Sequence, residues 1–127
     1  MERDLKIKFQ SVTLDAKDPK ALMHFYSELL GWELTYESDS FATLAAPDGG
    51  TGLGAQLVES YKPPVWPPEA DGADQGAHCD FQVSDLESAV ALALKLGAKK
   101  ADDQLIDNLA VMIDPEGHPF CLFPAWE

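Results

Sequence analysis

Among the residues in the second half of the sequence whose side chains can do chemistry are His78, Asp80 and Cys121. His78 and Asp80 are two positions apart, so on a regular strand they share a face, where Asp80 can orient the imidazole or a polar ligand. Cys121 lies in the stretch DPEGHPFCLF, 114–123, between two apolar residues. A thiolate acting with an imidazole can bind zinc, whereas a protonated cysteine in a strand is a small hydrophobe. Both alternatives stay open for Cys121, and its apolar neighbours favour the buried hydrophobe.

His78 also has two interpretations, a ligand-binding role and a histidine hydrogen-bonded at the start of a strand. Another candidate is Trp66, in the proline-rich segment SYKPPVWPPEADGADQGA, 60–77. A large amphipathic ring on a stiffened loop can cover a ligand or pack on a second subunit, although structural packing is favoured. The glycines of GGTGLG, 49–54, do not form a phosphate loop, because no helix follows whose N-terminus would face a phosphate.

Composition indicates one compact domain. The chain has 127 residues, of which 46% are hydrophobic, enough for a core. Its formal net charge of −13 argues against nucleic acid and anionic membranes as partners, because both need a basic patch. The charged opening MERDLKIK and the lack of a long apolar stretch predict a cytoplasmic protein with two unpaired cysteines.

The sequence contains an internal repeat. Asp85 lies 67 positions after Asp18, and Gly97 lies 66 positions after Gly31. Each aspartate follows an alternating strand-like run and precedes a helical pattern that stops near the glycine. We therefore expect two modules in one domain, about 5–60 and 78–127, joined by the proline-rich segment at about 60–77.

Each module is predicted to have the order β-α-β-β-β. In the first, a strand over 9–16 precedes a helix capped by Asp18, with Pro19 in its first turn and Gly31 at its end. In both predicted helices, apolar residues recur every three or four positions, and this spacing predicts a helix face that packs into the core. These residues are Leu22, Phe25, Tyr26 and Leu29 in the first module and Leu86, Ala89, Val90 and Ala93 in the second. The remaining strands are expected at 32–36, 41–45, 53–58, 99–101, 109–113 and 120–123.

This pattern resembles the vicinal oxygen chelate superfamily, which includes glyoxalase I, bleomycin-resistance proteins and extradiol dioxygenases. The segments FYSELLGWEL, 25–34, and DPEGHPFCL, 114–122, carry the resemblance most specifically, and residues 61–86 resemble a glyoxalase-like branch without an assigned reaction. The resemblance implies an α+β fold in which two tandem βαβββ modules form a cup-shaped curled mixed sheet. It also implies a homodimer and, in active members, a divalent metal such as zinc, nickel, manganese or iron.

The resemblance implies metal ligands in the first and last strands of each module. In the second module these positions fall on His78 and on Cys121, which stands where the family usually has glutamate. In the first module they fall on Ser11, a poor ligand when neutral, and, less definitely, on Gln56. The implied set therefore lacks its usual hard ligand.

The expected function is metal-independent or weakly metal-dependent binding of a small organic molecule in the cup. The expected ligand-binding residues are His78, Asp80, Gln56, Trp66 and Cys121. The alternative is a divalent-metal-dependent lyase or isomerase with an atypical site around His78 and Cys121, to which Gln56 would contribute. A third class, a structural or regulatory module, predicts a filled cup. Whether the protein is an enzyme stays open, because a fold identifies a scaffold and not a reaction.

Overall fold

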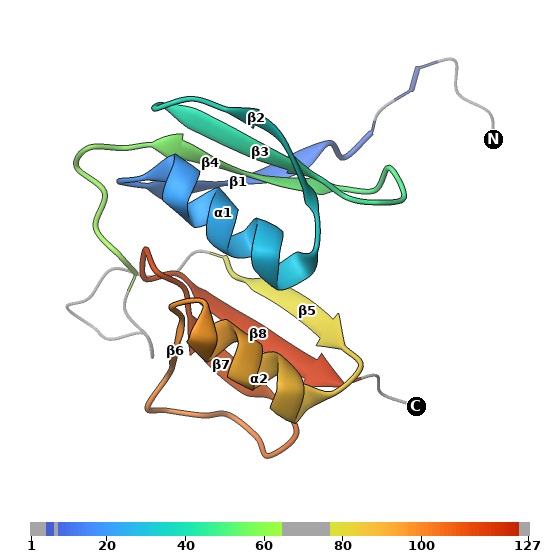
Figure 1. The fold of residues 1–127 in the computed structure, drawn as a ribbon, viewed down its shortest axis with the longest axis vertical. Helices are drawn as coiled ribbons and strands as arrows, with labels where there is room; N and C mark the ends of the chain where they lie inside the picture. Colours follow the sequence, from blue (N-terminus) through green and yellow to red (C-terminus); the bar gives the residue numbers. More distant parts are fainter. Residues whose placement is uncertain (1–4, 7, 65–76, 125–127) are drawn as a thin grey trace. The chain divides into compact units, whose positions relative to one another are not determined.

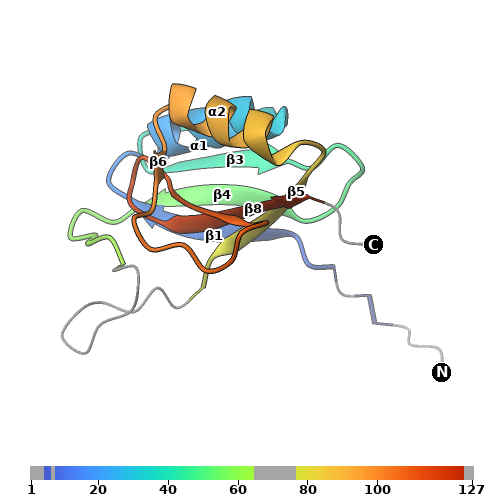
Figure 2. The same cartoon turned by 90° about the horizontal axis from the view of Figure 1, so that it is seen from below.

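The chain folds into two compact units, residues 1–58 and 59–127. A computed structural model describes residues 5, 6, 8–64 and 77–124. Each unit has the order strand, helix and three strands, and in each a single helix lies along one face of a four-stranded sheet (Figure 1 and Figure 2). The fold is therefore α+β with two βαβββ modules, as the repeat predicts.

The first unit contains β1 (Ser11–Ala16), α1 (Pro19–Leu30), β2 (Glu33–Glu37), β3 (Phe41–Ala45) and β4 (Gly52–Leu57). Its sheet has the order β1-β4-β3-β2, in which β1 and β4 are parallel and the other pairs are antiparallel. Helix α1 begins where the Asp18 carboxylate accepts a hydrogen bond from the backbone N–H of Ala21 at 3.1 Å. It ends at Gly31, whose φ of 72° is left-handed. Both predicted helix ends are confirmed.

The core of the first unit lies between α1 and its sheet. Leu22, Phe25 and Tyr26, at the predicted helical spacing, are at most 5% exposed. They pack with strand residues that are equally buried, among them Ala42, Leu44, Leu53 and Ala55. Each large apolar side chain buried here stabilises the fold by about 1.5–3 kcal/mol.

The second unit contains β5 (Cys79–Val83), α2 (Leu86–Lys95), β6 (Lys99–Lys100), β7 (Ala110–Ile113) and β8 (Pro119–Pro124). Its sheet has the equivalent order β5-β8-β7-β6, again with one parallel pair, β5 and β8. The helix start differs, because the Asp85 carboxylate accepts a hydrogen bond from the Ser88 hydroxyl and caps no backbone N–H. Neither α1 nor α2, the helices of the described residues, is long and apolar enough to cross a bilayer.

The turn between β7 and β8 is held by a buried carboxylate. Asp114, 3% exposed, accepts hydrogen bonds from the backbone N–H groups of Glu116 and His118 at 2.9 and 3.0 Å. Its Oδ2 also lies 2.8 Å from Nδ1 of His118, and the ring of Tyr61 stacks on that imidazole with centroids 5.2 Å apart. His118 therefore belongs to the turn, and the turn determines how β8 enters the sheet.

Candidate functional site

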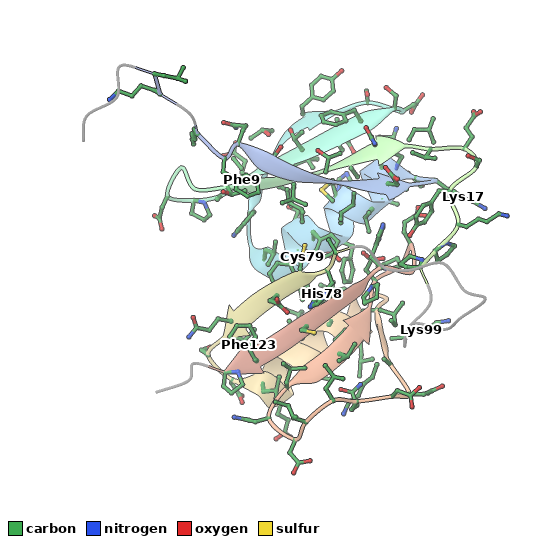
Figure 3. The ribbon with its side chains drawn as sticks, turned by 180° about the vertical axis from the view of Figure 1, so that it is seen from behind. Phe9, Lys17, His78, Cys79, Lys99 and Phe123 are labelled. Atoms are coloured by element: carbon green, nitrogen blue, oxygen red, sulfur yellow. The ribbon has the colours of Figure 1, made fainter. Side chains whose placement is uncertain are left out.

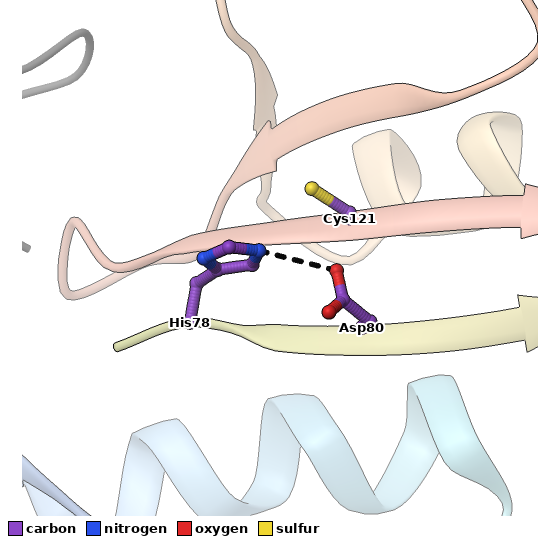
Figure 4. A group of neighbouring side chains, drawn as sticks. All are labelled: His78, Asp80 and Cys121. Atoms are coloured by element: carbon purple, nitrogen blue, oxygen red, sulfur yellow. Dashed lines mark ion pairs between the residues drawn. The ribbon is translucent and has the colours of Figure 1, made fainter. Parts of the chain in front are cut away.

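The candidate site is built from two neighbouring parallel strands, β5 and β8. Asp80 lies opposite Cys121 in their register, and His78 directly precedes β5. Because side chains alternate along a strand, His78 and Asp80 project from the same face as Cys121. Figure 4 shows the three side chains on one side of the two strands.

This face of the sheet is the one opposite α2. Ala110 of β7 lines a cavity together with Val90 of α2, so Ala110 lies on the face that the helix covers. Ala110 pairs with Leu122, and the neighbouring pair, Val111 with Cys121, must point the other way. Cys121 and its partners therefore lie outside the core between the helix and the sheet.

The donor atoms of the three side chains are close together. Nε2 of His78 is 3.2 Å from Oδ1 of Asp80, and one donor atom from each of the three residues lies within 4.8 Å of the others. The His78 and Asp80 side chains are 35% and 54% exposed, whereas Cys121 is only 3% exposed. The site therefore offers an exposed imidazole and carboxylate above a buried sulfur atom, and these donors can hold a metal ion.

The environment of Cys121 favours the protonated thiol. Burial raises its pKa to about 11, and the charge of Asp80 and a hydrogen bond to that carboxylate act in the same direction. Desolvation and a nearby negative charge both disfavour a thiolate. The predicted buried cysteine is confirmed, and its role as a ligand stays a prediction.

Cys79 is next to the site in sequence but belongs to the opposite face of β5. Figure 3 labels it beside His78 at the start of the strand. It is half-buried, and its pKa is raised mainly by burial and then by the charges of Asp114 and Asp80. Cys79 is therefore a natural internal comparison for Cys121.

The two first-unit residues implied as ligands, Ser11 and Gln56, lie on β1 and β4. Ser11 pairs with Gly52, and Gln56 pairs with Asp15, both on the same face of that sheet. The side-chain amide of Gln56 donates a hydrogen bond to Oδ1 of Asp15 at 2.8 Å, and both residues are exposed. This contact could not be recognised in the sequence, because 41 positions separate the two residues.

The sheet registers show which first-unit residue corresponds to Cys121. Asp80 opposite Cys121 in the second unit is equivalent to Thr13 opposite Gly54 in the first, since each residue is displaced by 67 positions. Gln56 lies two residues after Gly54, so it is the next residue of β4 on the same face of the sheet. Gln56 stays a predicted ligand, and the structurally equivalent position carries no side chain.

Two further features were not recognised in the sequence, and one predicted residue is not described. The contacts of Asp114 with His118 join neighbours in a turn, where the spacing D-x-x-x-H was the available signal. A cavity of about 370 Å³ beside α2 left no sequence signal, because its lining comes from distant segments. The lining residues are Leu86, Glu87, Val90, Lys100, Asp107, Leu109 and Ala110. Trp66 lies outside the described residues.

Comparison with known proteins identifies the family. Residues 11–123 match the model of the Glyoxalase-like domain, whereas no curated protein matches the chain. A glyoxalase/bleomycin resistance protein/dioxygenase family enzyme from Burkholderia phytofirmans PsJN has a similar structure, with a TM-score of 0.73 and 18% identity over 94% of this chain and 100% of that one. A glyoxalase/dioxygenase from Nostoc punctiforme has a TM-score of 0.69 and 20% identity, over 94% and 92% of the two chains. The chain belongs to the glyoxalase-like domain family, within the vicinal oxygen chelate superfamily.

Proposed function

We propose that the protein binds a small organic molecule around His78, Asp80 and Cys121, on the sheet face opposite α2. The proposal rests on the change from exposed polar to buried apolar side chains across this face. Exposed polar atoms of His78 and Asp80 stand at β5, and the buried side chains of Cys121 and Val111 follow on β8 and β7. Small-molecule sites combine apolar side chains with a few placed polar groups.

The polar end of this face favours ligands with a hydrogen-bond donor. The Asp80 carboxylate accepts hydrogen bonds only, and the imidazole of His78 beside it can donate or accept depending on its tautomer. A molecule with a hydroxyl, amide or ammonium group on a small apolar frame would match both the polar groups at β5 and the apolar side chains on β8 and β7. Gln56, beside Asp15 on the first sheet, and Trp66 are further proposed contacts.

We propose that metal contributes weakly to this binding or not at all. A metal must displace the proton of any thiol that it binds, and the pKa of Cys121, about 11, makes that displacement unfavourable near neutral pH. An organic ligand that uses His78 and Asp80 needs no such step. Binding should therefore persist when metal is chelated.

A divalent-metal-dependent lyase or isomerase is the second candidate, and the grouping of three donor atoms favours it. A divalent metal supplies Lewis-acid stabilisation of negative charge on a substrate oxygen. His78, Asp80 and Cys121 would hold the metal, with Gln56 as the predicted further ligand. This candidate predicts that chelation abolishes ligand binding or turnover.

The assembly and surroundings of the protein are part of the proposal. We propose a cytoplasmic homodimer without nucleic-acid or membrane partners. Family resemblance supports the dimer, and the net charge of −13 argues against polyanionic partners. Light scattering coupled to size exclusion should give twice the chain mass, and a monomer at micromolar concentration would contradict the dimer.

The test is a ligand-observed NMR screen of small polar organic molecules in EDTA, followed by calorimetry of the hits. His78→Ala and Asp80→Asn should each lower affinity about 10- to 100-fold, since a hydrogen bond to a charged group is worth about 1.5–3 kcal/mol. His24→Ala is the matched control. It removes another exposed histidine beside a carboxylate, Glu37, at 2.6 Å in the first unit.

The outcomes separate the candidates. Retained affinity in EDTA with loss in both site variants supports the metal-independent proposal. Binding that appears only when zinc, nickel, manganese or iron is restored supports the metal-dependent enzyme. Equal affinity of the wild type, His78→Ala and His24→Ala would place the ligand elsewhere and refute the proposed site.

A further inference from the structure

We propose that the cavity beside α2 is a second binding site, for a small zwitterion with an apolar body, such as an amino acid with an aliphatic side chain. The cavity lies on the side of the second sheet that α2 covers, whereas His78 and its neighbours project from the other side. Its lining belongs to α2, β6, β7 and the segment that joins those two strands (Figure 1). The inference therefore goes beyond the proposed function and does not depend on it.

The internal repeat explains why a cavity exists here. Val90 of α2 corresponds to Met23 of α1, and Ala93 corresponds to Tyr26, each displaced by 67 positions. Met23 and Tyr26 are at most 1% exposed and fill the space between α1 and its sheet. The smaller side chains of α2 leave a cavity of about 370 Å³, whereas close packing leaves few voids larger than a water molecule. This volume falls within the range of small-molecule sites, about 300–1,000 Å³.

One part of the lining is apolar and can cover the body of a ligand. Leu86 and Val90 of α2 contribute to it, together with Leu109 and Ala110 at the start of β7. The first three are half-buried, and Ala110 is 3% exposed. Each ligand methylene that leaves water for such a surface raises affinity about fourfold. The apolar part therefore favours an aliphatic body over a fully polar one.

The other part of the lining carries charges of both signs. Glu87 lies in the first turn of α2, Lys100 on β6 and Asp107 in the segment before β7. Lys100 pairs with Met112, two residues after Ala110, so Lys100 projects from the sheet face that α2 covers. In the part of the chain that the structure describes, none of the three charged groups has an ion-pair partner. All three are available to a ligand.

The arrangement of charges selects a zwitterion. An ammonium group has three N–H donors and can serve both Glu87 and Asp107, which only accept hydrogen bonds. A ligand carboxylate can accept from Lys100. A simple amine would leave Lys100 facing a second cation, and a simple carboxylic acid would face two like charges. A molecule with both groups matches the whole lining.

Three probes that share one apolar body test the inference. They are leucine, isopentylamine, which is leucine without its carboxylate, and isocaproate, which is leucine without its amino group. In amide-resolved NMR titrations of the full chain, leucine should bind saturably and shift signals of α2 and of residues 99–110. Each analogue should bind about threefold to tenfold more weakly, because a partly exposed ion pair contributes modestly to affinity.

Variants of the lining test the placement. Val90→Met introduces the residue of the first module and should weaken leucine binding at least tenfold by filling the cavity. Lys100→Met should remove the preference for leucine over isopentylamine. Asp107→Asn should weaken leucine and isopentylamine but not isocaproate. Lys99→Met is the matched control, because Lys99 is an exposed neighbour on β6 that projects from the other sheet face.

Absence of saturable leucine binding, equal binding of leucine and isopentylamine, or unchanged affinity in a folded Val90→Met would each overturn the inference. The amide spectrum of each variant shows whether it is folded. If Val90→Met does not fold, Lys100→Met decides, since it changes an exposed side chain. Leucine binding that is lost in His78→Ala and retained in Val90→Met would refute this site and support the proposed function. The opposite result would support this site alone.

Discussion

Asp80 and Cys121 face each other directly across the parallel strands β5 and β8, where the negative charge of Asp80 adds to burial in raising the pKa of the thiol. The pair places a proton donor and a negative charge side by side at the edge of the buried region. Burial, and then the negative charge of Asp80, raise the pKa of Cys121 and keep the thiol protonated near neutral pH. The pair lies at the binding site proposed above, so the state of the thiol bears on what that site can bind.

Cys121 should react slowly with alkylating reagents. Its pKa of about 11 leaves, at pH 8, roughly 200-fold less thiolate than a cysteine at the ordinary value near 8.5. Iodoacetamide kinetics on Cys79→Ser, in EDTA, isolate Cys121. The same variant in urea is the control and should react at the rate of an ordinary cysteine. Equal rates in the folded and unfolded chain would contradict the assigned environment.

The free energy of unfolding should fall as the pH rises from 9 to 11. Cys121 ionises near the ordinary cysteine pKa of about 8.5 when unfolded and at about 11 when folded, so between these values the unfolded chain has released a proton that the folded chain retains. Deprotonation therefore favours unfolding, by roughly 1–3 kcal/mol across the interval. Urea unfolding at successive pH values should show a shallower fall in Cys121→Ala. Parallel curves for the two proteins would refute the link to this thiol.

Asp114→Ala should destabilise the protein by about 2–4 kcal/mol, because it leaves two part-buried backbone N–H groups and the His118 ring without their acceptor. Thermal and urea unfolding measure the change. Asp48→Ala, which removes an exposed carboxylate between β3 and β4, should change stability by less than about 0.5 kcal/mol. A similar small effect of both substitutions would show that the Asp114 contacts contribute little.

Gly117→Ala should cost more stability than Gly49→Ala. Both glycines have positive φ, 96° and 72°, so each alanine is strained by about 1–2 kcal/mol. At Gly117 a Cβ would also lie 2.5 Å from Cβ of Pro63, whereas at Gly49 nothing lies within 4 Å. Paired denaturation curves test the difference. Equal losses would mean that residues near Pro63 move aside without cost.

The local elements were predictable from the sequence. Asp18 and Gly31 bound α1, and the apolar spacing of Leu22, Phe25 and Tyr26 identifies its buried face. These signals depend on contacts within one or two helical turns, where the chain's own geometry sets the neighbours. The repeat then extends the same order of elements to the second unit. The helix start at Asp85 differs, because its carboxylate accepts the hydrogen bond of the Ser88 hydroxyl.

The candidate site was only partly predictable. His78, Asp80 and Cys121 were recognised by type and position, and the burial of Cys121 was expected from its apolar neighbours. The hydrogen bond between Gln56 and Asp15 was not expected, nor was the correspondence of Cys121 with Gly54. Both depend on strand register, where a shift of one residue would turn every side chain to the other face.

The sequence by itself determined the order of the elements, the ends of α1 and the residue types available for chemistry, because these follow from periodicity and short-range capping. Only the tertiary structure decided that Asp80 opposes Cys121 and that the thiol is buried beside a carboxylate. Asp80 and Cys121 are 41 positions apart, and their pairing depends on how β7 and β8 add to the sheet after β5. The pKa of Cys121 then follows from desolvation and from a charge that only this pairing brings close.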